Sequence, residues 1–219
     1  MTAGSLAIAA ARPLILLARG WQVNSLRLKV QVTRAMPEQV QTRTLELPET
    51  ARPLAPSTQS WRDINTMTIG FGHGISVSPL HVVTGVSALA NGGVLRQPTL
   101  VAQEPGAAPR EGARVISERT SETMRKLMRL IVTDGSGKGA EVPGYFVGGK
   151  TGTADGPSGE EDGWFAGLAF DGAGRARYVV VVRLPGAGPG GGAPARLAGR
   201  ITRLLPPVDE SAVARSRSE

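Results

Sequence analysis

A lysine and two threonines follow a glycine-rich approach in the run Lys150-Thr151-Gly152-Thr153, which we predict to lie on a β-strand. Side chains alternate along a strand, so Thr151 and Thr153 share a face and their hydroxyls can bind one carboxylate together. Lys150 lies on the opposite face of an ideal strand, and a local twist or bulge is needed to direct it to the same ligand. Backbone N–H groups beside these hydroxyls suit the binding of an acyl substrate. A surface strand that ends in a Thr-Gly turn explains the same residues without any chemistry.

No activated serine accompanies this run. The 219 residues contain neither Ser-x-x-Lys nor Ser-x-Asn. A hydroxyl is a weak nucleophile until a neighbouring group takes its proton. The sequence therefore predicts one part of an acyl-transfer site without the residue that would attack the substrate.

The remaining candidate residues favour structural roles. His73 and His81 are the two histidines, and neither has an Asp or Glu at metal-ligand spacing. His73, in Gly-His-Gly, is interpreted as a turn residue held by packing, and the acidic run 160–162 is expected to be solvated. The segment 148–151 resembles half of a phosphate-binding loop, but the upstream glycine is missing and the order of strand and helix is wrong. We expect no metal and no cofactor.

The elements that must position the run belong to an α+β domain. Apolar patterning predicts three strands joined by short loops, which makes them antiparallel neighbours. The third strand is apolar throughout, which indicates burial on both faces. Helices are predicted where apolar residues recur at helical spacing, the first with Ser78 as N-cap and the second with Ser117 or Ser121. The predicted strands are 145–153, 164–170 and 178–184, with a short strand or extended segment at 94–101, and the predicted helices are 79–91, 117–133 and 195–205.

Basic residues are concentrated at the two ends of the chain. Residues 1–44 hold six basic residues and one acidic residue, 193–219 hold five and three, and 45–192 hold fourteen of each. These charges of +5, +2 and zero sum to the net charge of +7. A nucleic-acid interface would show a stripe of Arg and Lys with aromatic residues between them. No such stripe is present, and we expect no nucleic-acid partner.

The chain divides into three segments. Residues 1–44 are an atypical basic leader that we expect to be disordered or translated from the wrong frame of a GC-rich gene, because the composition changes abruptly at its end. Residues 45–205 form the domain, and 206–219 form a disordered tail. The longest apolar run near the start, 13–18, is flanked by two arginines. It is shorter than the roughly 20 residues of a spanning helix, so neither an anchor nor a signal peptide is expected.

Several blocks of the sequence resemble the C-terminal half of the transpeptidase domain of class B penicillin-binding proteins, most closely the cell-division type, the FtsI peptidoglycan D,D-transpeptidases. The blocks follow the order of the family and span about three-quarters of the chain. Their combination is far more specific than Lys-Thr-Gly alone. The fold implied is the C-terminal half of the transpeptidase or serine β-lactamase-like fold, an antiparallel sheet flanked by helices. The blocks are 65–80, 88–93, 134–140 and 148–154.

The resemblance implies a role for each residue of the run. Lys150 would supply positive charge beside the substrate carboxylate, and Thr151 and Thr153 would hydrogen-bond that carboxylate. The Thr153 N–H would be one donor of the oxyanion hole, and Gly152 would let the substrate approach closely. The implied catalytic residues are thus Lys150 and Thr153, and the implied substrate-binding residues are Thr151, Gly152 and Thr153.

The resemblance also implies partners and a location. The partners would be a peptidoglycan stem peptide ending in D-Ala-D-Ala, β-lactams that mimic it, and division proteins. Full-length members would lie in the inner membrane facing the periplasm. Because the first two motifs of the family are missing here, we expect this chain to be catalytically inactive and only marginally folded alone. The alternative is a non-catalytic interaction module that binds a partner chain of the division machinery.

Overall fold

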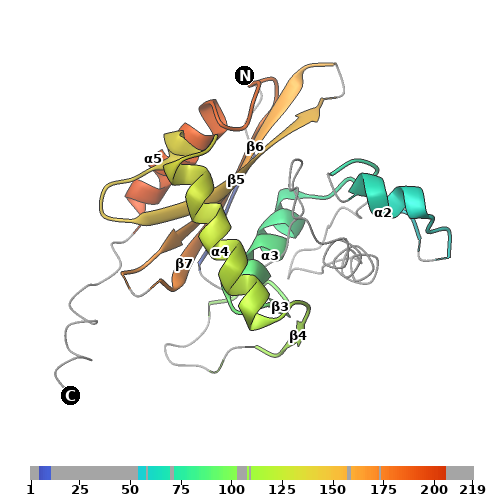
Figure 1. Cartoon of the computed structure of the whole chain (residues 1–219), viewed down its shortest axis with the longest axis horizontal. Helices are drawn as coiled ribbons and strands as arrows, with labels where there is room; N and C mark the ends of the chain where they lie inside the picture. The colour runs from blue at the N-terminus through green and yellow to red at the C-terminus, as the bar shows by residue number, and fades with distance from the viewer. Residues whose placement is uncertain are drawn as a thin grey trace.

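The computed structural model describes residues 5–10, 54–57, 59–69, 72–102, 108, 110–156, 159–172 and 174–205. Its central element is an antiparallel sheet of four strands in the order β1-β7-β6-β5 (Figure 1). These strands are β1 (Ser5–Ala10), β5 (Phe146–Asp155), β6 (Glu161–Phe170) and β7 (Ala176–Leu184). A second sheet pairs the short strands β3 (Val94–Arg96) and β4 (Gly112–Arg114).

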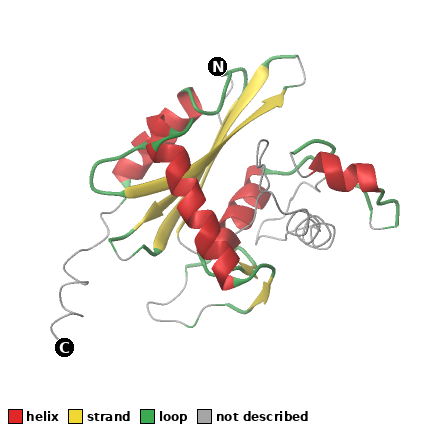
Figure 2. Cartoon of the chain, in the orientation of Figure 1, coloured by secondary structure: helices red, strands yellow, loops and turns green. Residues whose placement is uncertain are grey.

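Helices cover both faces of the four-stranded sheet (Figure 2). The predicted α+β architecture, an antiparallel sheet flanked by helices, is therefore confirmed. Side chains of α3 and α4 pack on one face, and those of α5 pack on the other. The helices are α2 (Asp63–Ile69), α3 (Pro79–Ala90), α4 (Glu118–Thr133), the 3-10 helix η1 (Lys138–Ala140) and α5 (Ala193–Leu204).

Alternation of side chains divides the core into two layers. Val179 and Val181 of β7 pack with α3 and α4, whereas Val180 and Val182 pack with α5. This is the burial on both faces that the apolar run predicted. Strand β6 follows the same rule, with Ala166, Leu168 and Phe170 in the first layer and Phe165 in the second.

The helix ends follow the local signals of the sequence. Ser78 caps α3, its hydroxyl oxygen accepting from the His81 N–H, and Pro79 occupies the first helical position. Ser117 caps α4 and accepts from the Thr120 N–H at 3.1 Å. After α3 the chain turns through glycines of positive φ, and the Gly93 N–H donates to the Ala88 carbonyl at 2.8 Å. The predicted bounds of these two helices are correct to within a residue.

The sheet gains one strand that the sequence did not predict. Strand β1 pairs antiparallel with β7, from Ser5 opposite Arg183 to Ala10 opposite Tyr178. The structure thus describes a strand at residues 5–10, where the sequence predicted no element. The physical reason lies in β7, which is apolar on both faces and would otherwise leave one edge of backbone N–H and C=O groups unpaired. The rest of the leader and the tail 206–219 lie outside the described residues.

Short elements account for the other differences. The predicted segment 94–101 forms a strand only over Val94–Arg96, and Pro98 lacks the N–H that a longer ladder would need. Strand β4 and helix α2 lie where no element was predicted. Both have seven residues or fewer, too few for apolar periodicity to be recognised.

One aromatic ring of the core also packs closely against glycine backbone. Phe165 of β6 is 0% exposed. A Cβ at Gly149, in the neighbouring strand, would overlap its ring. A Cβ at Gly167 would lie 2.9 Å from the ring, and one at Gly137, in the loop after α4, 3.2 Å. The ring thus joins two strands and a loop because three residues around it have no side chain.

We predict that Gly149→Ala lowers the free energy of unfolding by about 1–3 kcal/mol, because the added methyl must displace the Phe165 ring. The measurement is urea unfolding followed by circular dichroism. Gly172→Ala is the matched control, since a Cβ there meets nothing within 4 Å. Its change should stay within about 0.5 kcal/mol. Equal losses in the two variants would show that the ring does not limit the space at Gly149.

Candidate functional site

The Lys-Thr-Gly run lies on strand β5, as predicted, and the strand continues two residues beyond the predicted end, to Asp155. The β5–β6 ladder continues from Phe146 opposite Phe170 to Asp155 opposite Glu161 without a register shift. Thr151 lies opposite Phe165, so its side chain shares the α5 face of the sheet. Lys150 lies opposite Ala166 and shares the face of α3 and α4. The bulge that would bring Lys150 to the face of the threonines is absent from this ladder.

The Lys150 side chain returns to its own strand. Its half-buried ammonium Nζ donates to the carbonyl oxygen of Thr151. Burial removes water from the ammonium and lowers the pKa of Lys150 below the ordinary value of 10.5. The positive charge is therefore held next to the Thr151 carbonyl. A negatively charged ligand near it would offset part of the free energy that the ammonium loses on leaving water.

Thr151 receives a second polar contact from outside the strand. Its Oγ1 lies 2.8 Å from the Oγ of Ser136, a residue of the loop between α4 and η1. Helix α4 reaches this position by passing from one face of the sheet to the other. Met128 belongs to the layer with α3, whereas Val132, one turn later, belongs to the layer with α5. Ser136 was not predicted from the sequence, because nothing local links it to a strand fifteen residues away.

The loop from β7 to α5 lies directly on the backbone of the run. A Cβ at Gly190 would overlap the backbone of Gly152, and one at Gly191 would overlap the carbonyl oxygen of Ser136. On the neighbouring strand, a Cβ added at Gly163, opposite Thr153, would lie 2.7 Å from Pro194. Only glycine fits at these positions. The loop therefore fixes both the run and the Ser136 loop against the N-terminal end of α5.

An acidic residue expected to be solvated is buried beside the run. Asp162 is 3% exposed and lies opposite Ala154. Its Oδ2 accepts from Nε of Arg183 at 3.1 Å and also from the other end of that guanidinium, and its Oδ1 accepts from the Gly186 N–H at 3.2 Å. The Arg183 guanidinium in turn lies 5.7 Å from the Trp164 ring centre. The expectation was wrong for Asp162 because an isolated acidic run does not reveal a partner on another strand.

The histidines lie away from the run. His73 is exposed in the turn after α2, and His81 lies at the start of α3 with its Nδ1 2.7 Å from the Ser78 Oγ. Among the residues that the structure describes, no group of three or more His, Cys, Asp or Glu side chains could hold a metal ion. In the same part of the chain, no helix is long and apolar enough to cross a membrane.

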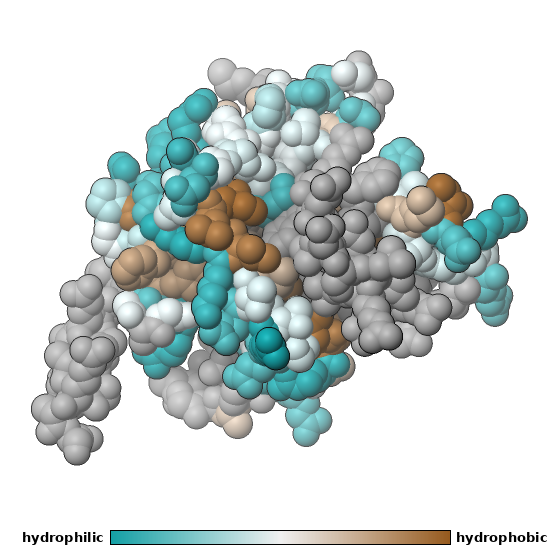
Figure 3. All heavy atoms as spheres, viewed as in Figure 1, coloured by the Kyte–Doolittle hydropathy of each residue, from teal (hydrophilic) through white to brown (hydrophobic). Residues whose placement is uncertain are grey.

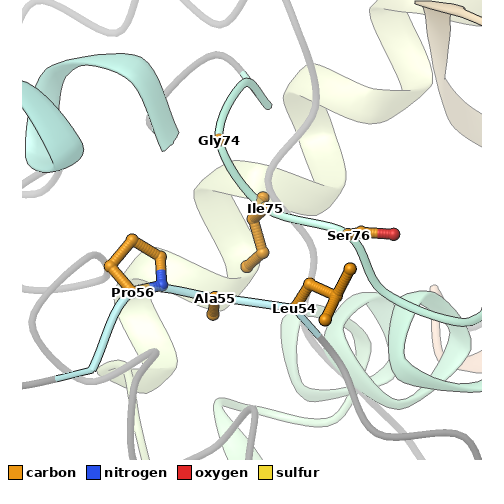
Figure 4. A pocket seen from close by; sticks show the side chains of 6 residues that line it. All are labelled: Leu54, Ala55, Pro56, Gly74, Ile75 and Ser76. Atoms are coloured by element: carbon orange, nitrogen blue, oxygen red, sulfur yellow. The ribbon is translucent and has the colours of Figure 1, made fainter.

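A groove of about 550 Å³ lies between two extended segments joined by the bridge of Leu54 to Ser76 (Figure 4). None of the residues that line it carries an acid, a base or an amine. It therefore offers shape but no catalytic group. The lining residues are Leu54, Ala55, Pro56, Gly74, Ile75 and Ser76.

An antiparallel sheet between α3–α4 and α5, with Lys-Thr-Gly on its edge strand β5, is the arrangement implied by the resemblance to transpeptidases. The sequence model of the penicillin binding protein transpeptidase domain matches residues 41–203. The chain belongs to this family.

Curated relatives and solved structures agree. The probable peptidoglycan D,D-transpeptidase FtsI of Caulobacter vibrioides is 46% identical over 114 residues, which are 51% of this chain and 19% of that protein. FtsI of Escherichia coli is 32% identical over 142 residues, 62% of this chain and 24% of that protein. The transpeptidase domain of Burkholderia pseudomallei penicillin-binding protein 3 superposes with a TM-score of 0.65 and 27% identity, covering 77% of this chain and 55% of that one.

The match to these proteins is partial in length. The apo structure of Mycobacterium tuberculosis penicillin-binding protein 3 superposes with a TM-score of 0.65 and 28% identity, covering 84% of this chain but 48% of that one. The chain thus spans about half of these two solved structures and 19% and 24% of these two curated relatives. Its family and fold are those of a transpeptidase domain.

We predict that Lys150 loses its proton at a lower pH in the folded chain than in urea. A folded-state pKa below 10.5 means that the unfolded chain binds more protons between the two values. The free energy of unfolding should therefore rise with pH in that window for the natural chain, and should not do so for Lys150→Met. The measurement is an NMR titration of the lysine side-chain signals, with urea unfolding at each pH. A folded-state midpoint at or above the unfolded one would contradict the burial of this ammonium.

We predict that Asp162→Ala lowers the free energy of unfolding by about 1–3 kcal/mol, because it leaves the Arg183 guanidinium and the Gly186 N–H without their acceptor. Thermal and urea unfolding give the value. Glu122→Ala is the control, since Glu122 pairs with Lys126 on the exposed side of α4. That variant should change stability far less. Similar losses in both would mean that the buried pair adds nothing beyond a surface ion pair.

Proposed function

We propose that this chain is the Lys-Thr-Gly half of a peptidoglycan D,D-transpeptidase domain that acts in cell division, and that its run binds the terminal carboxylate of a D-Ala-D-Ala stem peptide. The observation that carries the proposal is the arrangement of polar groups on β5. Thr151 and Thr153 share one face, and Lys150, on the other face, donates from its ammonium to the Thr151 carbonyl. One edge strand thus offers two hydroxyls on one face and a partly desolvated cation held at the backbone of Thr151.

The proposed roles follow from this geometry. The hydroxyls of Thr151 and Thr153 donate to the carboxylate, and Lys150 supplies the compensating charge. Gly152 carries no side chain on the face opposite to the two threonines, where a Cβ would lie 3.4 Å from the Trp164 Cβ, and we propose that this lets the substrate backbone approach the strand closely. The Thr153 N–H is proposed as one oxyanion-hole donor, acting on the carbonyl that a nucleophile attacks. β-Lactams would occupy the same place, and penicillin-binding protein 3 of Mycobacterium tuberculosis, a structural relative, has been solved in complex with aztreonam.

Covalent catalysis needs a serine that these 219 residues do not provide in an activated form. None of their serines is followed by lysine three positions on, and a hydroxyl without a base is a poor nucleophile. We propose that the chain binds the stem peptide weakly and does not form an acyl-enzyme by itself. In the complete enzyme the location would be the inner membrane, facing the periplasm.

The test is a pair of measurements on the purified chain. Incubation with fluorescent penicillin should leave no covalent label after denaturing electrophoresis. Titration with a diacetyl-Lys-D-Ala-D-Ala peptide should shift the amide signals of Lys150, Thr151 and Thr153 in the NMR spectrum. Thr151→Val with Thr153→Val should weaken this binding by about a hundredfold, because two hydrogen bonds to a charged group are lost. Covalent labelling, or binding that the two threonine substitutions do not affect, would falsify the proposal.

A second candidate function, a non-catalytic module that binds a partner chain, is favoured by the surface of α4. Leu130 and Phe146 are 54% and 56% exposed, and Leu127 lies one turn before Ile131 on the same side. Figure 3 shows apolar atoms gathered over the C-terminal half of α4. The occupant we propose is the polypeptide that carries the other half of the domain, since this chain spans only about half of the solved structures. Co-purification with a Ser-x-x-Lys polypeptide, lost in Leu130→Asp, would support this function; a monomer at low salt would count against it.

A further inference from the structure

We propose that Ser136 is a positioning residue for carboxylate binding at Thr151. The inference rests on the proposed function, in which the Thr151 hydroxyl donates to the carboxylate of the stem peptide. Ser136 Oγ lies 2.8 Å from Thr151 Oγ1, and either hydroxyl can be the donor. Ser136 stands outside the Lys-Thr-Gly run and reaches it only because the loop after α4 returns to β5.

The number of protons in the pair decides which hydroxyl must donate. A threonine hydroxyl has one proton and two lone pairs, and a carboxylate only accepts. If Thr151 donates to Ser136, it has no proton left for the ligand. If Ser136 donates to Thr151, the Thr151 proton is available and points away from Ser136. A bound carboxylate therefore favours the hydrogen-bond arrangement in which Ser136 donates to Thr151 and Thr151 donates to the ligand. Consecutive hydrogen bonds of this kind strengthen one another.

The backbone around Ser136 holds it in this place. The Gly137 N–H donates to the Ile131 carbonyl at 2.8 Å, which closes the turn after α4. A Cβ at Gly135 would lie 2.9 Å from the same carbonyl, and a Cβ at Gly191 would overlap the Ser136 carbonyl. The loop is thus packed backbone to backbone on both sides of Ser136. The Ser136 side chain remains exposed while it contacts Thr151. A ligand bound to Thr151 would therefore lie near the Ser136 hydroxyl.

A purely structural role for Ser136 predicts a different result from a positioning role. A hydroxyl that merely held the loop would change stability and leave ligand discrimination unaltered. If the Ser136 hydroxyl directs the Thr151 proton, its removal should weaken the preference of the site for a ligand that ends in a carboxylate, which only accepts hydrogen bonds, over one that ends in a carboxamide, which also donates them. The preference can be measured with two peptides that differ in one group, diacetyl-Lys-D-Ala-D-Ala and the same peptide ending in a carboxamide.

The experiment titrates both peptides into the full ¹⁵N-labelled chain and compares dissociation constants. The natural chain should prefer the acid. Ser136→Val should reduce that preference by about three- to tenfold, the range of a single hydrogen bond to an ion-binding group. Ser136→Thr, which has the same shape as valine but keeps a hydroxyl, should retain it. In a Thr151→Val background, Ser136→Val should have no further effect, because the two hydroxyls act as one unit.

The outcomes separate this inference from the proposed function. If Thr151→Val loses the preference for the acid but Ser136→Val keeps it, Ser136 has no positioning role and the proposed function stands. If the natural chain shows no preference, both fall. If Ser136→Val and Ser136→Thr lose the preference alike, the loop rather than the hydroxyl is responsible and the inference is overturned. The two variants differ only in a methyl group in place of a hydroxyl. A folding defect in either variant would therefore be recognised by comparing its ¹⁵N spectrum with that of the other.

Discussion

The packing of the Phe165 ring against bare backbone is the constraint on which the site depends. The ring is fully buried between Gly149, Gly167 and Gly137, from two neighbouring strands and the loop after α4. A side chain at any of them would push the strands or the loop apart. Because Gly149 immediately precedes Lys150, the same packing that closes the α5 layer also fixes the start of the functional run. The glycine-rich approach is therefore a requirement of the core before it is a feature of substrate binding.

The same close packing explains how polar groups from distant parts of the chain meet on β5. Glycines 190 and 191 let the loop before α5 lie on the backbone of Gly152 and Ser136. Residues of helix α4 pass from the layer of α3 to the layer of α5, so the loop that follows the helix reaches the face of Thr151. Lys150, on the other face, is partly desolvated by the layer of α3 and α4, and its pKa falls for that reason. One face of the sheet therefore carries the threonine hydroxyls and the other carries the Lys150 ammonium. The ammonium is linked to the threonine face by its hydrogen bond to the Thr151 carbonyl.

In the proposed function, a strand that carries these groups without an activated serine binds an anionic substrate end but supplies no bond-forming step. Hydrogen-bond donors contribute to binding and to oxyanion stabilisation, and the chemical step waits for a nucleophile with a base beside it. The buried pair of Asp162 and Arg183 stabilises the hairpin on which the run lies. Family membership and fold follow from the match over residues 41–203, and the chain covers 19% of the length of the Caulobacter relative.

The sequence by itself determined the family blocks, the three main strands, the capped helices and the alternation that puts Thr151 and Thr153 on one face. These depend on local properties, namely side-chain period, capping residues and glycine turns. Tertiary structure alone decided that Asp162 is buried, that β1 completes the sheet, and that Ser136 lies against Thr151. Each of these depends on a partner far along the chain, which no local pattern reports. The partial burial of the Lys150 ammonium also depends on tertiary structure, although its acceptor is the carbonyl of the next residue, because the packing around the strand removes its water.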